Sequence, residues 1–237
     1  MSLLEIKGLE TEFQTEQGVV KALRGINYTV DRGEVLGIVG ESGSGKSVGM
    51  LSLMGLLAPN GTVTAGEMIF DGEDISPIKY KTKKEKKEYE KKMNQIRGND
   101  ISMIFQDPMS YLNPIVTIEK QMTEGIRFHT KCSKKEAVQR AVELMKMVGI
   151  PAPESRLKQY PFEFSGGMRQ RIIIAIALAC NPKLIVADEP TTALDVTVQA
   201  QILDLLKDIT RESNAGVIII THDLGAVSYT HLTLPTN

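Results

Sequence analysis

The sequence predicts an α/β fold with an inserted helical part, and three observations predict it. The apolar run Val35–Val39 leads into a glycine-rich loop and then a helical stretch from about 47 to 57. A second apolar run, residues 184–187, precedes a helix from about 196 and a strand at 217–220. Between these parts, residues 115–163 follow a helical pattern, which we expect to form an inserted subdomain.

Length and composition are those of an ordinary globular domain. The 237 residues suffice for one large α/β domain, or for one with an inserted subdomain. Hydrophobic residues make up 42% and charged residues 24%, and 28 Lys and Arg nearly balance 29 Asp and Glu. Whole-chain charge therefore gives no reason to expect a nucleic-acid partner.

Cysteine use and hydropathy indicate a reducing, cytosolic setting. Cys132 and Cys180 lie far apart and form no CxxC pair, so we expect neither a disulfide framework nor a zinc site. The N-terminus lacks the basic start and apolar core of a signal peptide. Since no uninterrupted apolar run reaches about 18 residues, a transport function would need separate membrane subunits.

Extended segments are expected in the opening third of the chain, besides the helical stretch at about 47–57. Ile26, Tyr28 and Val30 alternate with other residues and lead through a turn at 31–33 into the first apolar run. Residues 66–75 are typical of a pair of strands bounded by glycines, and 101–105 predict a strand just before Gln106.

A lysine-rich segment, residues 79–92, interrupts this pattern. It holds eight Lys against three Glu with almost no aliphatic side chains, so we expect a solvated helix or loop without a buried face. The alternative is a basic patch for anionic lipid or nucleic acid.

The helical part has a recognisable start signal. Ser133 and Glu136 form a capping box before a run of apolar residues at helical spacing. A further helix is expected from Gly166, where the α/β pattern resumes.

The glycine-rich loop fits the phosphate-binding pattern GxxxxGK[ST]. Its context, after a buried strand and before a helix, argues against the alternative of a merely flexible turn. Glycines let backbone N–H groups converge on phosphate oxygens, and the helix N-terminus adds positive charge. We expect Lys46 to contact the β and γ phosphates of a nucleotide and the Ser47 hydroxyl to coordinate Mg²⁺. The nucleotide-binding loop comprises Gly40, Glu41, Ser42, Gly43, Ser44, Gly45, Lys46 and Ser47.

Two acids follow the second apolar run. Ligands of open α/β sheets gather at the carboxyl ends of the strands, where Asp188 and Glu189 are expected. We predict that Asp188 holds Mg²⁺, directly or through water, and that Glu189 polarises an attacking water. A solvated acidic loop is the alternative if the pair is considered alone.

One further stretch, 164–171 (FSGGMRQR), resembles the LSGGQ signature of ABC-type ATPases. In that family the segment opens a helix that touches the γ-phosphate of ATP bound to another subunit. The resemblance therefore implies nucleotide contacts for Ser165, Gly166 and Gly167. An N-capping serine followed by glycines is the structural alternative.

Other matches to the family follow in its order. Gln106 resembles the Q-loop residue, a catalytic and Mg²⁺-contacting position, and Asp195 resembles the D-loop aspartate at the nucleotide. His222 resembles the catalytic switch histidine. Phe13 resembles the aromatic residue that stacks on adenine, although a lone phenylalanine commonly belongs to a core.

The resemblance, over roughly residues 3–228, implies an organisation for the whole chain. We expect a P-loop NTPase of ABC ATPase type, with a mixed central sheet, an N-terminal antiparallel β part and an inserted helical subdomain at about 110–165, all within one domain at 1–228. It also implies ATP and Mg²⁺ as cofactors. Implied partners are a second ABC ATPase subunit, identical or not, two transmembrane permease subunits and, indirectly, a solute-binding protein, at the cytoplasmic face of the cell membrane.

Stretches around Gln106, Ser165 and Glu189 resemble the oligopeptide and dipeptide importer branch, which includes nickel importers. Family members continue well beyond the position of His222, so we expect the chain to be truncated at its C-terminus. Residues 229–237 depart from the family pattern and resemble translated sequencing-adaptor sequence; an ordinary polar tail is the alternative.

Two other functions compete with import. A soluble ABC ATPase that acts on nucleic acid or ribosomes generally needs a coiled-coil insertion or tandem ATPase domains, which we do not find in the sequence. A regulatory nucleotide-binding module without turnover is disfavoured because the consensus catalytic positions are occupied. Another solute, such as nickel, remains an alternative cargo.

Overall fold

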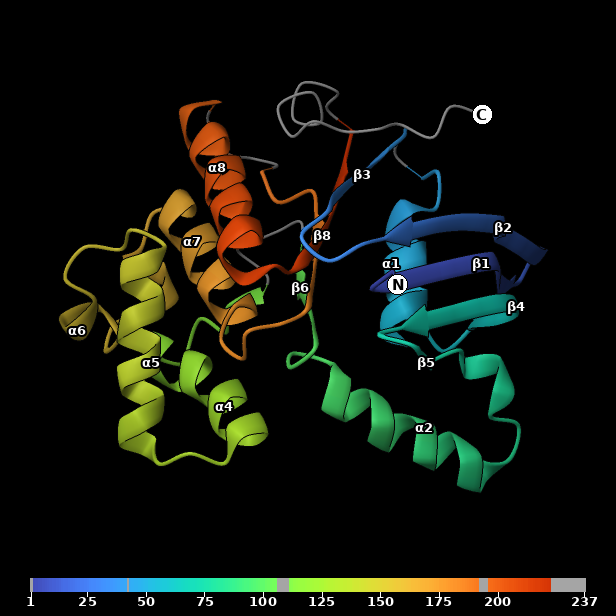
Figure 1. The fold of residues 1–237 in the computed structure, drawn as a ribbon, viewed down its shortest axis with the longest axis horizontal. Coiled ribbons are helices and arrows are strands. Elements are labelled where there is room, and N and C mark those ends of the chain that lie inside the picture. The colour runs from blue at the N-terminus through green and yellow to red at the C-terminus, as the bar shows by residue number, and fades with distance from the viewer. Residues whose placement is uncertain (1, 42, 106–110, 192–195, 223–237) are drawn as a thin grey trace.

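The computed structural model describes residues 2–222 except 42, 106–110 and 192–195, so residues 229–237 lie outside it. Two four-stranded sheets stand side by side with a helical layer beyond them (Figure 1). The first sheet is antiparallel, in the order β2-β1-β4-β5. Its strands are β1 (Leu4–Thr15), β2 (Gly18–Val30), β4 (Gly61–Phe70) and β5 (Glu73–Asp74).

The second sheet is parallel, in the order β3-β8-β7-β6. It consists of β3 (Val35–Val39), β6 (Ile101–Ile104), β7 (Leu184–Asp188) and β8 (Gly216–Thr221). The expected antiparallel and parallel parts are both present, but they form two separate sheets in the described chain. The apolar runs at 184–187 in β7 and 217–220 in β8 fit strands that are buried on both faces.

Alternate residues of the parallel sheet enter two different cores. Val186 and Ile218 pack with β1, β4 and helix α1 (Lys46–Met54), while Ile185 and Val217 pack with the helical layer. This two-residue period is the pleat of the strands, and it makes the parallel sheet the partition between the antiparallel sheet and the helices.

The predicted helical subdomain is present. It contains α4 (Ile118–Thr130), α5 (Lys134–Met147), α6 (Pro153–Arg156) and a 3₁₀ turn at Pro161–Glu163, and it packs on α7 (Gly166–Ala177). The capping box at Ser133 and Glu136 is confirmed. Helix α8 (Val196–Ser213) lies in the same layer (Figure 1). Within the described residues, no helix combines the length and apolarity needed to cross a membrane.

The lysine-rich segment forms helix α2 (Lys83–Ile96), preceded by a 3₁₀ turn at Pro77–Lys79. Thr82 and Glu85 cap its start reciprocally. The expectation that this segment has no buried face is wrong, because Tyr89, Met93 and Ile96 are buried. These three residues recur at helical spacing, so they place one side of α2 against the core of the antiparallel sheet.

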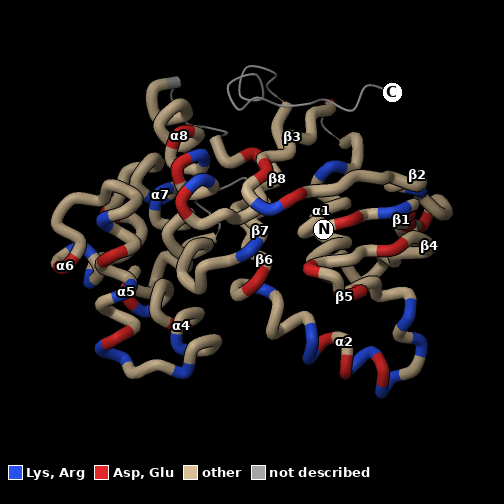
Figure 2. The backbone as a smooth tube through the Cα atoms, viewed as in Figure 1, with Lys and Arg blue, Asp and Glu red and all other residues tan. Residues whose placement is uncertain are grey.

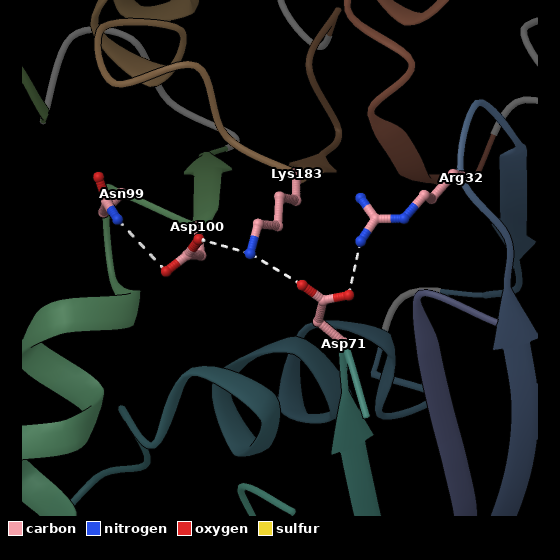
Figure 3. Close-up of polar contacts among 5 residues, drawn as sticks. All are labelled: Arg32, Asp71, Asn99, Asp100 and Lys183. Atoms are coloured by element: carbon pink, nitrogen blue, oxygen red, sulfur yellow. Dashed lines mark hydrogen bonds and ion pairs between the residues drawn. The ribbon is translucent and has the colours of Figure 1, made fainter. Parts of the chain in front are cut away.

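A charged cluster joins the two sheets at the amino ends of the parallel strands (Figure 3). Asp71, in the β4–β5 turn, accepts from Arg32 at 2.5 Å and from Lys183 at 2.8 Å. Lys183 also lies 3.2 Å from Asp100. The Lys183 hydrogen bond, with both cationic neighbours, lowers the pKa of Asp71. The cluster thereby ties together the segments that precede β3, β6 and β7.

Candidate nucleotide site

The predicted site residues that the structure describes gather mainly at the carboxyl ends of β3, β7 and β8. Strands that run parallel end at the same edge, so Gly40 after β3, Asp188 at the end of β7 and His222 after β8 share that edge. The charged cluster around Asp71 lies at the other end of these strands.

The nucleotide-binding loop turns tightly because two glycines adopt left-handed conformations. Gly43 has φ 81° and Gly45 has φ 91°, values that side-chain-bearing residues rarely adopt. A Cβ at Gly45 would lie 2.7 Å from the carbonyl oxygen of Ala22, so the loop packs directly on the backbone of β2. Sequence reasoning did not identify Ala22, because a backbone contact leaves no signal in residue type.

Lys46 folds back over this loop. Its Nζ donates to the carbonyl oxygens of Gly40 at 2.6 Å and Glu41 at 2.7 Å. The loop's Glu41, Gly43, Ser44 and Ser47 are exposed. The ammonium group therefore stands at an open, glycine-rich helix start, which fits a polyphosphate ligand. Ser42, the remaining loop position, lies outside the described residues.

The side chains of Ser47 and Asp188 lie in contact, and their predicted role as Mg²⁺ ligands stays a prediction. Asp188 is only 7% exposed, and burial raises the pKa of its carboxyl group, with the Glu189 charge adding to the effect. A hydrogen bond with Ser47 and the charge of Lys46 oppose that rise in pKa. A hydroxyl and a carboxylate side by side are the oxygen ligands that suit Mg²⁺, so the residues present fit this ion.

Glu189 is held in an unusual conformation beside His222. Its φ is 47°, in the left-handed region, and its N–H donates to the carbonyl oxygen of Ile220 at 2.9 Å. Its Oε1 lies 3.2 Å from Nδ1 of His222. The Glu189 side chain is 13% exposed and that of His222 is 60% exposed. Such backbone strain at a non-glycine residue concentrates at functional sites, where surrounding structure maintains it.

The signature-like segment lies elsewhere. Ser165 caps α7 and accepts from the N–H of Met168 at 3.3 Å. A Cβ at Gly167 would be 3.0 Å from Val198 of α8, whereas one at Gly166 would meet no atom within 4 Å. Helices α7 and α1 belong to different cores on opposite faces of the parallel sheet. Ser165 and Lys46 are therefore on separate sides of the sheet.

Phe13 lies on β1, with its ring over Gly61 of β4. Its role at a base stays a prediction. Gln106 and Asp195 lie outside the described residues, so their predicted roles also stay untested.

Comparisons with known proteins agree with this geometry. Residues 23–192 match the profile of a family described as "ABC transporter". The chain is 54% identical to "Oligopeptide transport ATP-binding protein OppD" of Bacillus subtilis (strain 168), covering 95% of this chain and 61% of that protein. It is 50% identical to "Dipeptide transport ATP-binding protein DppD" of the same organism, covering 95% and 65%. The chain thus spans less than two thirds of the length of these relatives.

A solved structure shares the fold. It is described as the dimeric structure of a post-hydrolysis state of the ATP-binding cassette MJ0796 bound to ADP and Pi. The TM-score is 0.80 at 29% identity, over 96% of this chain and 91% of that one.

Proposed function

The chain belongs to the ABC transporter family, and on that premise we propose that it is the ATP-binding and ATP-hydrolysing subunit of an importer of oligopeptides or dipeptides. The observation that carries this proposal is the convergence of Lys46, Ser47, Asp188, Glu189 and His222 on one edge of the parallel sheet. That set contains a phosphate contact, a metal ligand pair and a candidate base with an orienting partner.

Binding falls to the loop and its helix. Backbone N–H groups of the loop and the N-terminal end of α1 receive the phosphates, and Lys46 exchanges its carbonyl contacts for phosphate oxygens. Ser47 and Asp188 would hold Mg²⁺, which would supply positive charge for electrostatic stabilisation. The three glycines Gly40, Gly43 and Gly45 keep side chains out of the way of this backbone approach.

Hydrolysis falls to Glu189. A carboxylate at the strand end can accept a proton from a water aimed in line with the terminal phosphate. Nδ1 of His222 is within reach to donate to Oε1 of Glu189, which fixes the carboxylate's orientation. Phosphoryl transfer depends mostly on positioning and on electrostatic stabilisation of the transition state. Glu189 and Lys46, each held in place, would supply much of both.

The site is completed by another subunit. Ser165 and Gly166 open α7 on the opposite face of the sheet from Lys46, so their contact with a phosphate requires a second ATPase subunit, identical or not. The dimeric description of the solved relative supports this arrangement. We propose that two permease subunits and, indirectly, a solute-binding protein complete the transporter at the cytoplasmic face of the membrane, and that no nucleic acid is bound.

The test is ATP turnover in the assembled transporter. ATP hydrolysis that depends on Mg²⁺ and rises with added peptide and solute-binding protein supports the proposal, whereas stimulation by Ni²⁺ alone would indicate the nickel importers instead. Turnover that is unchanged in a Lys46→Ala variant would place the chemistry elsewhere and overturn it.

A further inference from the structure

A groove of about 1060 Å³ lies between helix α2 and the end of α4. One wall is formed by α2, which contributes Lys84, Lys87 and Lys91. The other is formed by Phe128 and His129 of α4 and by Lys131 just after it. Figure 2 shows the charged residues that recur along α2, beyond the antiparallel sheet from which the helix departs.

The two sides of α2 have opposite characters. Lys84, Lys87 and Lys91 follow each other at i, i+3 and i+7 and are all exposed, so they form one stripe. Tyr89 and Met93 lie on the opposite side of the helix and are buried. Packing against the core therefore holds the lysine stripe outward, toward the groove.

Two of the three acids in this lysine-rich part of α2 are engaged away from the stripe. Glu85 is engaged by the helix cap at Thr82, and Glu90 pairs with Arg97 at 3.0 Å. Glu88 is the other acid in the wall of the groove. Within the described part of the chain, none of the four groove lysines has an ion-pair partner within 4.0 Å. Like charges at these helical spacings repel by roughly 0.2–0.5 kcal/mol per pair, and an anionic surface would relieve that repulsion.

An exposed aromatic residue stands beside the lysines. Phe128 is 67% exposed, and its ring meets that of His129 edge-on at a centroid distance of 4.8 Å. Unpaired lysines next to an exposed aromatic ring favour binding to an anionic membrane surface. The lysines can bind lipid phosphates, and the aromatic ring can insert into the interfacial region of the bilayer.

We propose that this groove, defined by Lys84, Lys87, Lys91, Phe128 and Lys131, binds the phosphate head groups of anionic lipids. Lysine carries a compact charge on a flexible side chain. It is therefore better suited to binding mobile lipid head groups than to binding one fixed bidentate partner. The inference goes beyond ATP hydrolysis and does not depend on it, since the groove shares no residue with the nucleotide site.

The experiment measures co-sedimentation of the chain with vesicles, without nucleotide. Vesicles of phosphatidylcholine are compared with vesicles that also contain phosphatidylglycerol. We expect binding to the anionic vesicles only, weakening as NaCl is raised because salt screens surface charges. The variant K84Q/K87Q/K91Q should lose roughly a hundredfold in affinity, and Phe128→Ser should lose a smaller factor.

A matched control removes the same charge elsewhere. Lys120, Lys135 and Lys158 are exposed and lie outside the groove, so K120Q/K135Q/K158Q should bind the anionic vesicles almost as the parent does. Circular dichroism checks that each variant is folded; should the groove triple variant unfold, Lys131→Gln with Phe128→Ser replaces it. Equal losses in both triple variants, or no preference for anionic vesicles, would refute the proposal. Binding of an acidic peptide in place of vesicles would refute it in favour of a protein partner.

Discussion

Nδ1 of His222 lies 3.2 Å from Oε1 of Glu189, across two neighbouring strands of the parallel sheet. Register brings them together, because Asp188 pairs with Ile220 and the N–H of Glu189 donates to the carbonyl oxygen of that same residue. Glu189 is thus fixed by backbone pairing to β8, and His222 follows two residues after Ile220.

Glu189→Gln should retain ATP binding and lose most turnover. The amide keeps the size of the side chain but cannot accept a proton from water, and positioned general bases contribute roughly 10²–10⁴-fold. Nucleotide affinity and phosphate release, measured on the same assembled transporter, separate the two effects. Near-normal phosphate release would show that Glu189 is not the base.

Lys46→Ala should weaken nucleotide binding itself. The lost ammonium would have made charge-assisted hydrogen bonds worth about 1.5–3 kcal/mol, which is roughly a ten- to hundredfold loss in affinity. Equilibrium titration with a fluorescent ATP analogue measures it. Lys7→Ala, on the exposed side of β1, serves as control and should leave affinity unchanged.

Ser165→Arg should damage the site that belongs to the partner subunit. Ser165 starts α7 on the far side of the sheet from Lys46, so the separated chain should still bind nucleotide at its own loop. ATP-driven dimer closure, followed by size-exclusion chromatography, should fail because a bulky cation blocks backbone approach. Loss of nucleotide binding by the folded, separated chain would exclude a composite site.

Gly45→Ala should cost more stability than Gly43→Ala. Both residues have positive φ, but only the Gly45 Cβ would collide, at 2.7 Å from the Ala22 oxygen. Strain of this kind costs of order 1–3 kcal/mol, which for a chain of this size lowers the melting temperature by roughly 2–4 °C per kcal/mol. Thermal unfolding of the two variants compares them. Equal melting temperatures would mean that the loop can move away from β2.

Acid should weaken the charged cluster at the amino ends of the strands. The hydrogen bond that Lys183 donates to Asp71 lowers the pKa of the Asp71 carboxyl group below the ordinary 3.8, so folding favours the ionised form of Asp71. The stabilisation is present above the unfolded-state pKa and is lost as pH falls through the lowered folded-state value. Urea unfolding below about pH 4 should therefore show a steeper loss for the parent than for Asp71→Asn, which has no proton to gain. Identical dependence of the unfolding free energy on pH in the two proteins would show that ionised Asp71 contributes nothing to stability.

Most of the fold could be predicted from the sequence, and so could the positions of the described residues that share the carboxyl edge of the parallel sheet. The loop at Lys46 and the acids Asp188 and Glu189 each follow an apolar strand at a characteristic spacing. Local sequence patterns are therefore enough to predict them. The contact between Glu189 and His222 could not be derived in this way, because it depends on the register between β7 and β8. The buried side of α2 was not predicted, for a different reason. Met93 and Ile96 lie just beyond the lysine-rich segment 79–92, and only together with Tyr89 do they form a buried helical stripe.

The strand order has a consequence for how the chain reaches this structure. Val35 of β3 pairs with Val217 of β8, so the strand that leads into the nucleotide-binding loop has its lateral partner at the far end of the described chain. Contacts between residues so distant in sequence form slowly, since a long loop must close before they are made. During synthesis, β3 therefore emerges from the ribosome long before its neighbour, while β1, β2 and β4 can already pair locally. We expect the antiparallel sheet to assemble early and the nucleotide site to be the last part to take shape.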